Sequence, residues 1–171
     1  MPSSRQLISS QVLGSTTATV TFSSIPGTYK DLILKISART GRTDPDYILL
    51  TFNSDTTSSG TTYSDTYMLG SGSAATSGRD SSGATIYDVG IPGVNQTSNT
   101  FSSTEIYIPS YTASDNKPFS SFSVTENNAT AADIWVGANL WKNTAAITQI
   151  NMKAVSSFVA GSSFYLYGLA S

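Results

Sequence analysis

Apolar and polar residues alternate with a period of two along most of the chain, and this pattern predicts β-strands. It is clearest in the last third, from Ala132 to Leu169. Two of its strands place apolar residues on one face: Ile134, Val136, Ala138 and Leu140 in the first, and Ile150, Met152 and Ala154 in the second. The last strand, 164–169, is apolar on both sides, which is typical of a strand inside a sheet. We therefore expect the final residues to complete the fold.

The same alternation predicts earlier strands, separated by turns rich in Gly, Pro, Asn and Asp. They are expected near 5–13, 17–22, 29–39, 47–53, 84–90, 101–111 and 119–125. No segment has a convincing helical pattern, and no repeat of fixed period is present. The sequence therefore predicts an all-β protein, a jelly-roll-like antiparallel β-sandwich of about eight or nine strands.

One segment, 54–83, breaks the alternation because it is dominated by Ser, Thr, Gly and Asp. A compact domain seldom contains so long a connection without a use for it. We expect a long Ser/Thr/Gly-rich loop, which either packs on a neighbouring subunit as an arm or moves freely on the surface. An apolar island inside it favours the arm and supplies the candidate partner contacts: Tyr63, Tyr67, Met68 and Leu69.

Composition supports a folded β protein with a hydroxyl-rich surface. The 171 residues fall in the size range of one all-β domain, so we expect a single domain over 1–171. Ser and Thr make up about a third of them, and charged residues only 12%, against a usual value of about 25%. The 39% of apolar residues provides a core, which separates this chain from disordered ones.

The absent residue types and the low charge exclude several function classes. There is no Cys and no His, which removes thiolate chemistry, the usual general base and the commonest metal ligand. A net charge of −2 leaves no strongly basic face for nucleic acid. The N-terminus has no leader pattern and no segment is long and apolar enough for a membrane span. We expect no cofactor, no nucleic-acid or membrane partner, and synthesis in a cytosol without export.

Carboxylates are the remaining candidates for chemistry. Asp44, Asp46, Asn53 and Asp55 bracket one strand and are expected to be solvated turn residues, with a bound cation as the alternative. Glu105 and Glu126 are the only glutamates, and their spacing does not pair them for glycoside cleavage. Arg39 is expected to be a solubilising surface residue. We therefore expect the protein not to be an enzyme.

Two tryptophans form the last candidate site. Trp135 and Trp141 are six residues apart, so on one strand they share the face opposite Ile134 and Val136. Such aromatics are most often buried in a core or an interface, and less often form a stacking platform for sugar rings. Both uses stay open for this pair.

Four stretches of the chain resemble a known group of proteins. They are 24–34 (SIPGTYKDLIL), 106–111 (IYIPSY), 141–150 (WKNTAAITQI) and 164–168 (FYLYG). Together they resemble small virion structural proteins encoded by tailed bacteriophages, across nearly the whole chain. The resemblance implies a β-sandwich that is either a capsid decoration or cement protein or a tail or fibre module.

The small size leaves no separate shaft or attachment region, which favours the first of these. We expect a non-enzymatic capsid decoration protein that docks on the outer head surface, with the major capsid protein as partner and a homotrimer as one option. It would reside in the virion, assembled in the host cytoplasm. The alternative is a tail or fibre-tip module that binds a host surface glycan.

Overall fold

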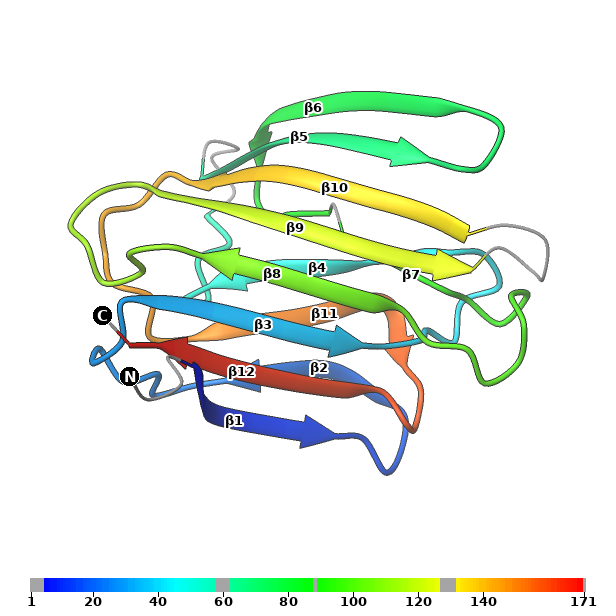
Figure 1. Cartoon of the computed structure of the whole chain (residues 1–171), viewed down its shortest axis with the longest axis horizontal. Helices are drawn as coiled ribbons and strands as arrows, with labels where there is room; N and C mark the ends of the chain where they lie inside the picture. The colour runs from blue at the N-terminus through cyan, green and yellow to red at the C-terminus, as the bar shows by residue number, and fades with distance from the viewer. Residues whose placement is uncertain (1–4, 58–61, 88, 127–131, 171) are drawn as a thin grey trace.

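The computed structural model describes residues 5–57, 62–87, 89–126 and 132–170 and contains only β-strands as regular elements in those ranges. Twelve strands form two antiparallel sheets packed face to face (Figure 1). They are β1 (Arg5–Val12), β2 (Thr17–Phe22), β3 (Asp31–Ser37), β4 (Asp46–Phe52), β5 (Tyr63–Gly70), β6 (Ala75–Gly83), β7 (Gly90–Ile91), β8 (Ser103–Ile108), β9 (Lys117–Glu126), β10 (Ala132–Trp141), β11 (Ile150–Phe158) and β12 (Ser163–Leu169). The expected antiparallel β-sandwich is confirmed, with more strands than the sequence suggested.

The strand order is that of a jelly roll with an extension. The large sheet runs β1-β12-β3-β8-β9-β10-β5-β6, and the small sheet runs β2-β11-β4-β7. Eight strands, four in each sheet, follow the jelly-roll path: they pass from one sheet to the other at each step except between β4 and β7, which are neighbours in the small sheet. The other four, β9, β10, β5 and β6, widen the large sheet beyond the small one (Figure 1).

The prediction of a long loop over 54–83 is wrong for most of that segment, which forms strands. Most of this segment forms β5 and β6, a hairpin whose first strand pairs with β10 from Tyr63 to Gly70. Backbone pairing rather than apolar alternation holds β6 in place, since residues 75–81 are mostly exposed. The apolar island therefore belongs to β5 of the large sheet.

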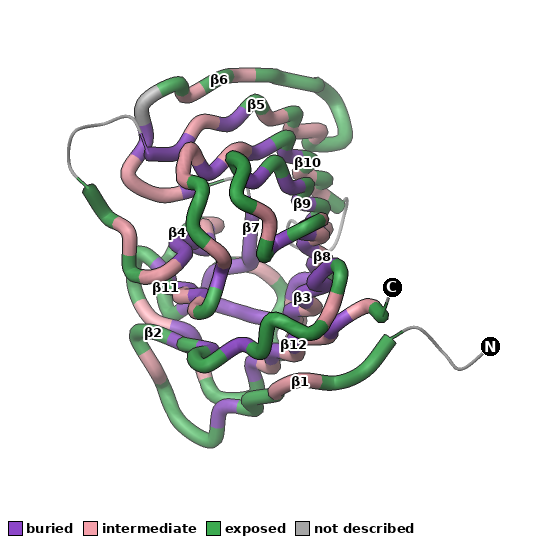
Figure 2. Tube along the Cα trace, turned by 90° about the vertical axis from the view of Figure 1, so that its left-hand side faces the viewer, coloured by how far each residue is buried: buried purple, intermediate pink, exposed green. Residues whose placement is uncertain are grey.

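The core lies between the two sheets, where the buried residues gather (Figure 2). Inward residues of β3, β8 and β12 meet those of β2, β4 and β11, and the central aliphatic ones are fully buried. β12 lies between β1 and β3, as its two apolar faces predicted. Its neighbour β3 is buried on both faces over 31–34.

Candidate functional site

The sequence-derived candidates separate into three places, of which the first is the core. Tyr63 and Trp141 are both fully buried. The Tyr63 hydroxyl accepts the amide of Phe52 at 2.8 Å, and the Trp141 indole N–H donates to Asp55 at 2.9 Å. Neither ring is available to a glycan or a partner in the folded protein.

Asp55 secures the Trp141 corner of the core. Burial alone would raise the pKa of Asp55, but hydrogen bonds from Thr57, Trp141 and Asn143 outweigh it and leave the pKa below its usual range. Asn143 Nδ2 donates to the same carboxylate oxygen as the indole, at 3.1 Å. The ionised carboxylate thus ties the turn after β4 to the turn after β10.

This lowered pKa has a measurable consequence. A carboxyl whose pKa is lower in the folded state stabilises the fold above its unfolded pKa of about 3.9, and that stabilisation is lost as pH falls through the folded value. We expect the Tm to drop below about pH 4, and to drop less in Asp55→Asn, which should already be less stable at pH 7. Thermal scans from pH 7 to pH 2 on both proteins measure this. An equally large drop of the Tm at low pH in Asp55→Asn would show that this pH dependence does not come from Asp55.

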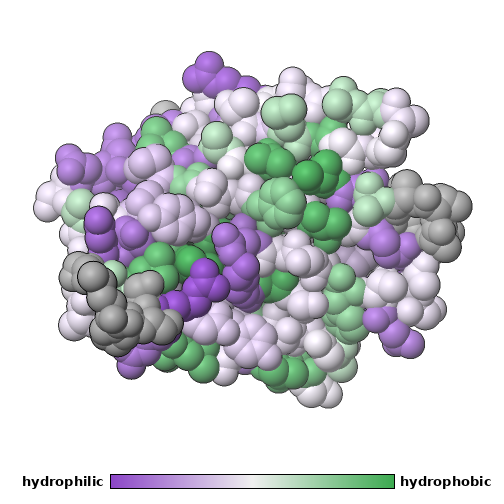
Figure 3. Space-filling view, viewed as in Figure 1, coloured by the Kyte–Doolittle hydropathy of each residue, from purple (hydrophilic) through white to green (hydrophobic). Residues whose placement is uncertain are grey.

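The second place is an exposed apolar patch on the outer face of the large sheet. Met68, Val136 and Phe122 lie side by side across β5, β10 and β9, and Ile134 follows Val136 on the same face. Their exposed fractions are 59%, 40%, 46% and 40%. They form a green cluster in Figure 3, and we call these four residues the outer patch. The face of β10 opposite the tryptophans is thus turned to solvent.

Polar groups border the outer patch on two sides. Glu105 of β8 lies opposite Phe122 and forms an ion pair with Lys35 of β3. On the other side of the patch, Ser77 of β6 lies opposite Met68. An apolar centre with a polar rim is the usual anatomy of a protein interface.

The third place is a hollow on the inner side of the large sheet, where the β5–β6 hairpin extends beyond the small sheet. Its volume is about 520 Å³. The described lining residues are Tyr47, Asp65, Tyr67, Leu69, Thr76, Arg79, Asp80, Tyr87 and Trp135. We call it the inner hollow. It brings together three of the candidates named from the sequence, namely Tyr67, Leu69 and Trp135.

Two glycines let the aromatic rings of the inner hollow lie close to the backbone. A Cβ on Gly78 would stand 2.5 Å from Cζ of Tyr67, and one on Gly90 would stand 2.5 Å from Nε1 of Trp135. Trp135 is also met edge-on by Tyr47, with ring centroids 5.3 Å apart. These contacts fix the orientation of the rings before any ligand arrives.

Two carboxylates complete the inner hollow. Asp65 and Asp80 are paired across β5 and β6, and Asp65 is only 5% exposed. Burial is the main cause that raises the pKa of Asp65; the Asp80 amide, which donates to it, works against this, and the Asp80 charge adds to it. Like charges on directly opposed strand positions are unfavourable. The hollow therefore combines aromatic walls with two acidic groups and one arginine, Arg79.

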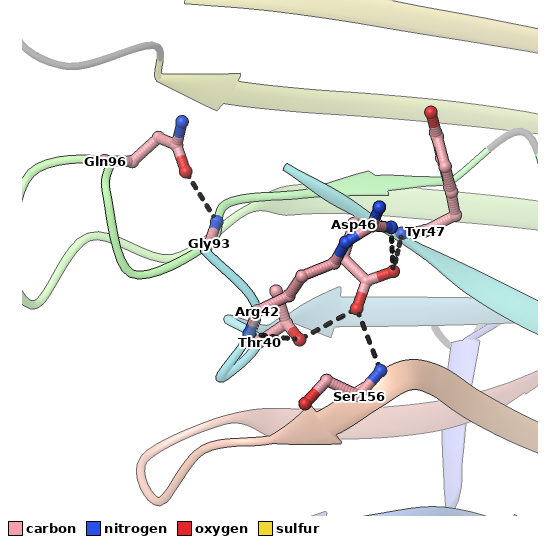
Figure 4. A network of polar contacts seen from close by, with 7 residues as sticks. All are labelled: Thr40, Arg42, Asp46, Tyr47, Gly93, Gln96 and Ser156. Atoms are coloured by element: carbon pink, nitrogen blue, oxygen red, sulfur yellow. Dashed lines mark hydrogen bonds and ion pairs between the residues drawn. The ribbon is translucent and has the colours of Figure 1, made fainter. Parts of the chain in front are cut away.

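The acidic residues around β4 do not form a cation site. Asp46 is fully buried rather than solvated: its carboxylate accepts the Thr40 hydroxyl at 2.8 Å and the Ser156 amide at 3.3 Å (Figure 4). Arg42 approaches it at 3.7 Å. At the other end of β4, Asn53 accepts the Thr148 amide at 2.9 Å. Across the residues with described positions, no group of three acidic side chains could hold a metal ion.

Arg39 is not the solubilising residue that the sequence suggested. It is 7% exposed, and its guanidinium donates to the carbonyl oxygens of Gln96, Thr97 and Thr100 at 3.0, 2.8 and 3.1 Å. It therefore holds the loop between β7 and β8. Sequence alone had no signal for this, because the acceptors are backbone atoms nearly sixty positions away.

The two glutamates have separate structural partners. Glu105 pairs with Lys35 on the outer face, and Glu126 accepts the hydroxyls of Thr97 and Thr100 at 3.1 and 3.2 Å. Within the described ranges, no helix is long and apolar enough to cross a membrane. No family model, curated protein or solved structure matches the chain.

Proposed function

We propose that this protein is a non-enzymatic structural protein of a tailed-phage virion, a capsid decoration or cement protein that docks on the outer surface of the head. The single observation that supports docking is the outer patch. Four large apolar side chains are 40–59% exposed and adjacent on an otherwise hydroxyl-rich sheet. Contiguous exposed apolar patches on soluble proteins commonly mark interaction sites.

The rigid scaffold under the patch suits a permanent attachment. Each patch residue lies on a strand that is paired on both sides, so docking needs no ordering of the backbone. The proposed partner is the major capsid protein, and a homotrimer on the capsid surface is compatible with one patch per subunit. Virion location and assembly in the host cytoplasm follow from this proposal. Jelly rolls also serve as viral capsid and lectin domains, so the fold supports this class by analogy alone.

Polar substitutions in the outer patch should abolish docking without unfolding the protein. We expect Val136→Ser combined with Phe122→Ser to weaken binding to heads by at least about tenfold, since buried apolar area at the centre of an interface supplies most of its affinity. The measurement is co-sedimentation with phage particles assembled without this protein, followed by cryo-EM of the decorated particles.

The matched control is Val155→Ser, which changes a valine that is 51% exposed on β11 of the small sheet. It should bind like the wild type. Equal binding by the patch variant would contradict the docking surface, and density on tails rather than heads would contradict the decoration role.

A tail or fibre-tip module that binds a host glycan is the second candidate. The observation that favours it is the inner hollow, with its four aromatic side chains and its acidic pair. Density for the protein on tails, combined with sugar binding, would favour this candidate over decoration.

A further inference from the structure

We propose that the inner hollow between the β5–β6 hairpin and the edge of the small sheet binds a saccharide. This deepens the second candidate function by naming its site, and it does not depend on capsid docking. The volume of about 520 Å³ lies within the range of about 300–1,000 Å³ that is usual for small-molecule pockets. One or two pyranose rings fit such a space.

The aromatic walls match the apolar side of a sugar ring. Trp135 and Tyr67 are held against glycine backbones, and Tyr47 braces Trp135 edge-on. Tyr87 is 44% exposed at the rim, where an incoming ring would meet it. Rings that are already oriented lose little entropy when a flat ligand stacks on them. The C–H face of a pyranose supplies such a surface.

The polar groups match the hydroxyls of a saccharide better than they match a cation. Asp65 and Asp80 accept hydrogen bonds, whereas the hydroxyls of Thr76 and of the tyrosines both donate and accept. A polyol needs donors and acceptors together, while an ammonium ligand needs acceptors and aromatic faces only. The hollow is also much larger than an ammonium group. Sugar binding is the use that engages all of its walls.

The hollow and the outer patch lie on opposite faces of the large sheet, so they can be tested separately. Tyr67 and Trp135 point inward, whereas their sequence neighbours Met68 and Val136 point outward. A decoration protein could therefore dock by one face and present the other to a glycan.

The test titrates the full chain with free sugars and follows saturation-transfer NMR. The probes are glucose, galactose, mannose, rhamnose, N-acetylglucosamine, N-acetylgalactosamine, lactose and maltose, with choline as the cationic probe. Thr76→Trp fills the hollow without removing a core residue, and Tyr87→Ser removes one exposed wall. Thr66→Trp is the matched control, because Thr66 is an exposed threonine on the outer face of the same hairpin.

We expect at least one sugar to bind wild-type protein and Thr66→Trp equally, and to bind Thr76→Trp and Tyr87→Ser at least about tenfold more weakly. The proposal is overturned if none of these sugars binds, if Thr76→Trp binds as wild type does, or if choline alone binds. Sugar binding should be unchanged in Val136→Ser combined with Phe122→Ser. Loss of sugar binding in that outer-patch variant would place the site elsewhere and also overturn the proposal.

Discussion

Replacement of Trp141 by alanine should lower the free energy of unfolding by about 3–5 kcal/mol, the usual cost of removing a large buried aromatic. The indole is fully buried and packs against Phe52 with ring centroids 5.5 Å apart. Its removal leaves a cavity and takes one of the donors to Asp55 away. The free energy of unfolding of a domain is typically about 5–15 kcal/mol, so this one side chain accounts for a large part of it.

Urea unfolding followed by circular dichroism measures the change. Trp141→Phe retains most of the ring but lacks the N–H, so its smaller loss separates packing from the hydrogen bond. Val155→Ala is the surface control and should stay within about 0.5 kcal/mol of wild type. A loss below about 1 kcal/mol in Trp141→Ala would show that this ring is not in the core.

The second large effect is expected at Arg39. Arg39→Met should cost about 2–4 kcal/mol, because hydrogen bonds from a charged donor contribute more than neutral ones and three carbonyl oxygens lose their partner. Those oxygens belong to Gln96, Thr97 and Thr100. The β7–β8 loop that they form should then open first.

Arg42→Met is the matched control, with the same chemical change three residues later. The Arg42 side chain is 41% exposed, and its ion pair with the buried Asp46 is long, at 3.7 Å. Asp46 keeps its hydrogen bonds from Thr40, Tyr47 and Ser156, so the loss of Arg42 should cost less than the loss of Arg39. Urea midpoints compare the two, and hydrogen exchange of the 96–100 amides reports on the loop. Equal losses of unfolding free energy in both variants would mean that the hydrogen bonds of Arg39 add nothing to the stability of the fold.

The strand pattern was predictable wherever alternation reports on burial. β2 begins and ends where the sequence placed it, and β12 lies inside the sheet as its two apolar faces required. The hairpin β5–β6 was missed because residues 75–83 contain no large apolar side chain. Their strand state arises from pairing with β5, which is a tertiary effect that no local pattern contains.

The candidate site was predictable in its residues but not in its geometry. Tyr67, Leu69 and Trp135 were named from sequence, yet their meeting in one hollow depends on the pairing of β5 with β10. For β10, both faces contain large apolar residues, so periodicity cannot tell which face meets the other sheet. The face of β10 with Trp135 and Trp141 is the inward one, so Ile134 and Val136 lie on the solvent-exposed face.

The pairing of β1 with β12 joins the first and last described strands of the chain along almost their full length, from Arg5 with Leu169 to Val12 with Ser163. Segments so far apart in the sequence have a high loop-closure cost before any contact compensates for it, so we expect this pairing to form late in folding. Closure of this end of the sandwich is therefore expected to be slow, because its contacts join the two ends of the described chain. Until β1 is added, the outer side of β12 is an unpaired strand edge, and such edges promote aggregation of partly folded chains.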